Sequence, residues 1–145
     1  MKLKSLARLS SLFVVLALGA ATAADLPRSP APKDVELYII APKDGETVTS
    51  PVTVRFGLRG MGIAPAGVAM ENTGHHHLLI DTGPPPLDQP ISADAKHVHF
   101  GKGQTETVVT LAPGRHTLQL LLADHLHIPH DPPVMSKPIT ITVRP

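Results

Sequence analysis

Eight of the nine histidines in this 145-residue chain fall into three short clusters. The first is a run of three that leads straight into an apolar segment, in the stretch GHHHLLID at 74–81. The second is His-Val-His at 97–99, and the third lies between residues 125 and 130. Neutral imidazole is a good ligand for Zn²⁺ and Cu²⁺ near neutral pH. The clusters therefore predict a transition-metal site.

The spacing within the clusters indicates which histidines can act together. Residues i and i+2 of a β-strand point to the same face, with Cα atoms roughly 6–7 Å apart, so an H-x-H pair can present two rings to one ion. The middle histidine of the first cluster would face the opposite side. In the second cluster, Val98 and Phe100 would point away from the two histidines and into the core. The predicted ligands are His75, His77, His97, His99, His125 and His127.

Several other residues are further candidates, each with a structural alternative. His76 and His130 could join the site or be buried, and Met61 and Met70 could bind the ion or pack a loop. Thioether is a soft ligand for Cu(I), so a mixture of histidine and methionine in an exported protein favours copper over zinc. Asp81 and Asp124 could orient imidazoles or cap turns. His116 follows a Pro-Gly turn and is expected to hydrogen-bond to the backbone.

The amino-terminal residues predict export. Lys2, Lys4 and Arg8 precede a short apolar run and the small residues around Ala23, as in a secretory signal peptide spanning 1–23. The apolar run is short for a membrane span, so no stable membrane insertion is expected after cleavage. Without the three basic residues of the signal, the 13 basic and 12 acidic residues leave a net charge of about −2. This charge and an aromatic content of 3% argue against a nucleic-acid partner.

The remaining chain predicts one all-β domain over 35–145 after a flexible, proline-rich leader at 24–34. Short segments with β-branched or alternating apolar residues recur between Pro- and Gly-containing turns, and helical periodicity is absent beyond the signal. We expect an immunoglobulin-like antiparallel β-sandwich of about seven strands. The expected strands are 35–40, 52–58, 75–81, 96–100, 105–111, 115–123 and 138–143.

This fold would bring distant histidines together. In an immunoglobulin-like sandwich, the loops at 60–74 and 124–133 leave the sheets at the same end, so the first and third clusters would converge. At least three imidazole nitrogens within about 4–5 Å of one another would fit a site whose nitrogens lie about 2 Å from the ion. The chain contains no cysteine, which excludes disulfides and thiolate ligands and fits a bacterial envelope.

Ordered segments of the chain resemble a known family. The segments are GM at 60, PAG at 65, GHHHLLID at 74, HFGKGQTE at 99, PGRHTLQL at 113 and HIPH at 127. Together they resemble the small exported bacterial proteins called domain of unknown function 4399. The resemblance implies one exported domain and supplies neither an activity nor a ligand set.

The predicted function is binding of a copper or zinc ion in the periplasm of a Gram-negative-type envelope, or after secretion. The ion would be buffered, stored or delivered, with copper preferred and with an envelope protein as a possible partner. One alternative is a non-catalytic interaction module whose histidines brace its loops through hydrogen bonds. Another is a small-ligand or copper redox protein. No catalytic motif favours an enzyme.

Overall fold

A computed structural model describes residues 26–145 of the chain, and the predicted signal peptide lies outside them. Within these residues the secondary structure consists of nine strands without a helix, which confirms the all-β sandwich. The strands are β1 (Glu36–Ala41), β2 (Thr47–Val48), β3 (Val52–Arg59), β4 (Gly62–Ile63), β5 (Thr73–Ile80), β6 (His97–His99), β7 (Glu106–Val109), β8 (Gly114–Ala123) and β9 (Ile139–Val143). The two strands beyond the predicted seven, β2 and β4, have two residues each and are too short to show periodicity.

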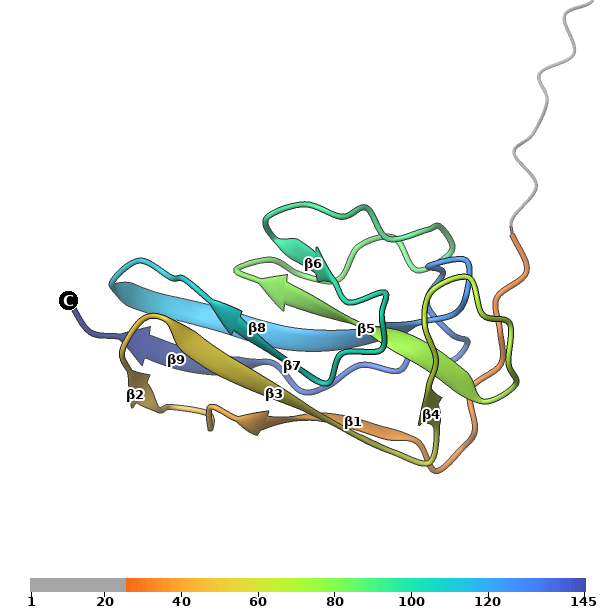
Figure 1. Cartoon of the computed structure of the whole chain (residues 1–145), viewed down its shortest axis with the longest axis horizontal. Coiled ribbons are helices and arrows are strands. Elements are labelled where there is room, and N and C mark those ends of the chain that lie inside the picture. The colour runs from red at the N-terminus through yellow and green to blue at the C-terminus, as the bar shows by residue number, and fades with distance from the viewer. Residues whose placement is uncertain (1–25) are drawn as a thin grey trace, which may run out of the picture.

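The strands form two sheets that pack face to face (Figure 1). The smaller sheet has the order β1-β3-β7, and the larger sheet has the order β2-β9-β8-β5-β4 with β6 also paired to β5. The long pairings are antiparallel, as predicted, whereas the short strands β2 and β4 pair in parallel with β9 and β5. Strand β5 is thus held by β8 along one side and by β4 and β6 along the other.

The main core lies between the sheets and is built by alternation. Leu78 and Ile80 of β5 and alternate leucines of β8 point inward and pack against residues such as Phe56 of β3. Complete burial of such a side chain contributes about 1.5–3 kcal/mol relative to exposure. Val98 packs against this core and Phe100 belongs to it, so the two residues of the 97–100 segment that were expected to point inward do so.

The outer face of the larger sheet carries a second, smaller core. Leu79 of β5 and Leu121 of β8 point outward and pack with Ile91, which belongs to the loop between β5 and β6. That loop and the one after β8 lie over the sheet on the side away from β1 and β3 (Figure 1). Strand β5 is consequently buried on both faces from Gly74 to Ile80, and any polar side chain on it lies away from bulk water.

The described part of the predicted leader contacts the domain that follows it. Residues 28–31, here called the N-terminal strap, lie along the loop after β8. The Ala31 N–H donates to the Asp131 carbonyl at 3.0 Å, and the Asp131 N–H donates to the Ser29 carbonyl at 2.9 Å. Arg28 adds a hydrogen bond to the Pro129 carbonyl and an ion pair with Asp131. The prolines keep the strap extended, and the loop supplies the backbone partners that hold it.

Candidate metal centre

Strand β5 sends its three histidines to opposite faces. His76 points inward, where its ring lies 5.0 Å from that of Phe56 and its Nδ1 lies 3.1 Å from the Gln104 carbonyl. His75 and His77 point outward with Leu79, and both are 0% exposed. Their ring centroids are 4.9 Å apart. Alternation therefore separates the run of three as the sequence predicts.

Strand β6 adds a third ring to the outer face. His99 is the direct antiparallel partner of His77, and opposed residues of such a pair share a face. The His99 ring centroid lies 5.1 Å from that of His77 and 5.0 Å from that of His75. One ring nitrogen from each of the three lies within 4.8 Å of the others. This spacing meets the distance criterion derived from the sequence.

A fourth ring comes from the loop after β8, about fifty residues along the chain. The His127 ring centroid lies 4.8 Å from that of His99, 4.9 Å from that of His75 and 6.2 Å from that of His77. The two loops that were expected to meet do so, because the Gly67 N–H donates to the His125 carbonyl at 3.0 Å. We call His75, His77, His99 and His127 the histidine cluster.

Asp124 builds the turn that carries His127. Its carboxylate accepts hydrogen bonds from the backbone N–H groups of Leu126 and Ile128, and its carbonyl accepts one from the His127 N–H. His127 itself has a φ of 66°, which is uncommon outside glycine. Burial raises the pKa of Asp124, but the hydrogen bonds from Ser29 and from the turn outweigh it and leave the pKa below its usual value. The turn is therefore held by a carboxylate that stays ionised.

Three rings of the histidine cluster have buried nitrogens without a hydrogen-bond partner among residues 26–145. Both nitrogens of His75, both nitrogens of His77 and Nε2 of His99 are buried without a partner among residues 26–145. A buried polar atom left unpaired costs about 1–3 kcal/mol, and most such atoms in proteins are paired. Residues 26–145 thus leave these buried nitrogens unsatisfied, and one nitrogen from each of the three rings lies within 4.8 Å of the others.

Burial keeps these rings neutral. Desolvation, with a smaller contribution from the neighbouring imidazoles, lowers the pKa of His75 to about 4 and that of His77 to about 2. Desolvation followed by the effect of His127 also lowers the pKa of His99. The Asp124 carboxylate acts in the opposite direction on the pKa of His75. Near neutral pH the rings offer lone pairs, and an ion would not have to displace protons from them.

The depressed pKa values predict that the metal-free protein loses stability in mild acid. Below about pH 6.5 the unfolded chain takes up protons on His75 and His77. The folded chain does not do so until the pH approaches 4, so acidification favours unfolding. The slope should be on the order of 1 kcal/mol per pH unit for each ring. Urea denaturation between pH 7 and 5 measures it. In the double variant His75→Leu/His77→Leu, the free energy of unfolding should depend less steeply on pH. An equal slope in that variant would show that these two histidines do not cause the pH dependence.

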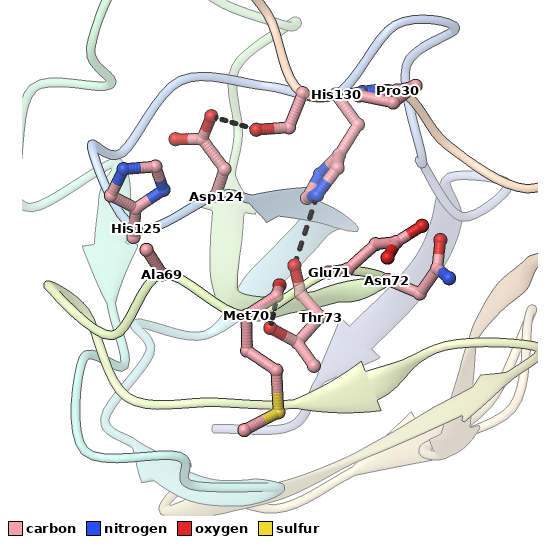
Figure 2. A pocket seen from close by; sticks show the side chains of 10 residues that line it. Pro30, Ala69, Met70, Glu71, Asn72, Thr73, Asp124, His125 and His130 are labelled. Carbon is pink, nitrogen blue, oxygen red and sulfur yellow. Dashed lines mark hydrogen bonds between the residues drawn. The ribbon is translucent and has the colours of Figure 1, made fainter.

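The other predicted ligands lie away from the cluster. His97 shares the outer face, but its ring is paired with Asp94 instead of with the cluster: its Nδ1 lies 3.0 Å from the Asp94 carboxylate. His125 and His130 line a separate cavity of about 290 Å³ beside the strap. Figure 2 shows them on either side of Asp124, with Nε2 of His130 3.1 Å from the Thr73 carbonyl. His125 and His127 diverge because they belong to a turn, where the two-residue alternation of a strand does not apply.

The methionines and Asp81 are also elsewhere. Met61 packs against the main core, and Met70, which is 63% exposed, is one of the residues that line the cavity of Figure 2. Asp81 accepts hydrogen bonds from His116, at 2.7 Å, and from the Thr117 N–H. The second nitrogen of His116 donates to the Ala112 carbonyl, so His116 is the corner histidine that its Pro-Gly turn indicated. Of the two aspartates, Asp124 alone shapes the cluster.

Ser29 was missed by sequence reasoning. Its hydroxyl donates to the Asp124 carboxylate at 2.7 Å and so connects the strap to the turn that carries His127. The residue lies among prolines in a segment without strand periodicity, and nothing local distinguishes it from a linker serine. The role of Ser29 can be recognised only in the folded protein, where the loop after β8 brings Asp124 within hydrogen-bond distance of it.

Comparisons with known proteins identify the family and no activity. The family model described as Domain of unknown function (DUF4399) matches residues 54–144, a span that includes all four members of the histidine cluster. No curated protein and no solved structure matches the chain. Residues 26–145 contain no helix long and apolar enough to cross a membrane. The chain belongs to the DUF4399 family.

Proposed function

We propose that this member of the DUF4399 family binds a transition-metal ion through His75, His77 and His99. The observation that carries the proposal is the convergence of three neutral imidazoles whose buried nitrogens have no partner among residues 26–145. An ion at their centre would satisfy one nitrogen of each ring. Histidine nitrogen binds zinc and copper alike, and no methionine lies in the cluster to favour copper.

The burial of the site supports buffering, storage or delivery of the ion rather than turnover. His75 and His77 are fully buried beneath the loops that cover the outer face, so a substrate would have no access to an ion held between them. Export to the periplasm, as the sequence predicts, would place the protein where such ions arrive from outside. An envelope partner that donates or accepts the ion is part of this proposal.

A purely structural role for the cluster is a weaker explanation. Histidines that brace loops do so through hydrogen bonds, as His116 does with Asp81 and Ala112. His75 and His77 make none within residues 26–145. Buried imidazoles without partners destabilise a metal-free domain, which a bracing role does not account for.

Equilibrium dialysis of the mature protein with Zn²⁺ and with Cu²⁺ tests the proposal. We expect one ion per chain at the cluster, and we expect His77→Ala to weaken its affinity by roughly 100-fold or more, since one of its donors is lost. His97→Ala is the matched control, because it removes a histidine from the same face outside the cluster. Circular dichroism of each variant without metal checks folding. Affinity weaker than about millimolar, or equal losses in both variants, would refute the proposal.

A further inference from the structure

We infer that His127 is the fourth ligand of this ion and that the four rings form a closed, tetrahedral site selective for Zn²⁺ or Cu⁺ over Cu²⁺. The inference rests on the proposed function and names the class of ion that it concerns. It starts from the six distances among the ring centroids of the histidine cluster. Five of them lie between 4.8 and 5.1 Å, and the sixth, between His77 and His127, is 6.2 Å.

Coordination geometry gives different distances for different ions. A nitrogen about 2.0–2.1 Å from a metal places its ring centroid about 3.2 Å from that metal. Four centroids at the corners of a tetrahedron are then all about 5.2 Å apart. In a square plane, four neighbouring pairs are about 4.5 Å apart and two opposite pairs about 6.4 Å apart.

The ring centroids of the histidine cluster form a tetrahedron opened along one edge, and the nitrogens that already lie within 4.8 Å of one another belong to His75, His77 and His99. If His77 and His127 were opposite corners of a square, then His75 and His99 would be the other opposite pair. Their centroids are 5.0 Å apart, well short of the separation that a square requires. The tilt between neighbouring rings ranges from 38° to 83°, so no two of them stack face to face. Closing the His77–His127 edge by about 1 Å would complete the regular figure.

The backbone of the cluster restricts it to this shape. Three ligands stand on paired strands, where β5 and β6 fix their positions. The fourth approaches from the opposite side, on the turn held by Asp124 and, through Ser29, by the strap. A planar arrangement would require the rings to rotate away from the positions that they now occupy between these elements. Zn²⁺ and Cu⁺ accept tetrahedral nitrogen, whereas Cu²⁺ prefers a tetragonal arrangement.

A site closed by four protein ligands also differs in chemistry from one closed by three. Structural zinc sites have four protein ligands, whereas catalytic sites keep a position for water. With His127 in place, the ion has no water to ionise. The Asp124 carboxylate, which interacts electrostatically with His75, partly offsets the positive charge of the ion. A closed site of this geometry therefore suits a protein that stores or transfers the ion.

Cobalt substitution tests the geometry, because Co²⁺ reports its coordination in the visible spectrum. Co²⁺ bound to the mature protein should give the intense visible bands of a tetrahedral ion, and these bands should stay constant between pH 6.5 and 9. In His127→Ala a water replaces the ring, so the bands should shift with pH as that water ionises, and the Zn²⁺ affinity should fall roughly 100-fold. His125→Ala, which removes the neighbouring histidine of the same turn, should behave like the natural protein.

Three results would overturn the inference while the three-histidine proposal stands. They are a weak, octahedral Co²⁺ spectrum, a spectrum and affinity unchanged in His127→Ala, and a planar four-nitrogen electron paramagnetic resonance signal from the Cu²⁺-loaded protein. Competition between Zn²⁺ and Cu⁺ under reducing conditions then identifies which tetrahedral ion is preferred. Failure of every ion to bind would instead refute the proposed function itself.

Discussion

Zn²⁺ in excess over the mature protein should raise its melting temperature by about 12–16 °C. A ligand that binds only the folded state at a free concentration about 1,000 times its Kd stabilises that state by about 4 kcal/mol. For a domain of this size, each kcal/mol corresponds to roughly 3–4 °C. The effect should be large because binding would also satisfy ring nitrogens that are buried without a partner among residues 26–145. Differential scanning calorimetry with and without Zn²⁺, and after a chelator, measures the shift.

Two double variants distinguish binding at the histidine cluster from binding to scattered surface histidines. His75→Ala/His77→Ala should abolish the shift, whereas His97→Ala/His125→Ala, with as many histidines removed, should retain it. A shift of the same size in both double variants would mean that the ion acts elsewhere. The absence of any shift in the natural protein would favour the interaction-module alternative.

Gly74→Ala should destabilise the protein by about 3 kcal/mol, because a Cβ at this position would clash with β8 and with the loop after it. A Cβ at this position would lie 2.7 Å from the Ala123 carbonyl oxygen, 2.8 Å from a Leu122 side-chain carbon and 2.9 Å from the His130 ring. The first of these atoms is backbone, so relief requires β5 to move. That movement displaces His75, the next residue, and metal affinity should fall with stability.

Gly83→Ala is the matched control for this prediction. Gly83 lies just after β5 in the loop that covers the outer face, and a Cβ there would meet nothing within 4 Å. Urea denaturation should give the natural stability for Gly83→Ala and a clearly lower midpoint for Gly74→Ala. Similar midpoints for the two variants would show that β5 and β8 can separate without cost, which would contradict the packing described here.

Sequence periodicity correctly predicted the direction of the side chains wherever the histidines lie on strands. It separated His76 from its two neighbours, and it placed Val98 and Phe100 toward the main core. Both results follow from the two-residue repeat of a strand, which needs no knowledge of the rest of the fold. The expected meeting of the loops at 60–74 and 124–133 also followed from the sandwich alone.

Periodicity did not predict the direction of side chains in the loops, where the chain leaves the sheets. His125 and His127 have the spacing of a strand pair, yet the turn around Asp124 sends one ring to the histidine cluster and the other to the cavity of Figure 2. The methionines were linked to the site by loop membership, and packing placed Met61 against the core instead. Turn conformation depends on hydrogen bonds between residues far apart in sequence, such as Ser29 and Asp124, which no local pattern reveals.

The strap also determines how the protein should be purified for these experiments. The first described residues lie beside the loop that carries His127, whereas the carboxyl terminus lies at the opposite end of the sandwich (Figure 1). An amino-terminal oligohistidine tag would place additional imidazoles next to the candidate centre and compete for its ion. A carboxy-terminal tag, removed before titration, keeps the affinity matrix and its nickel at a distance. Metal content measured on amino-terminally tagged protein would therefore report the tag as much as the fold.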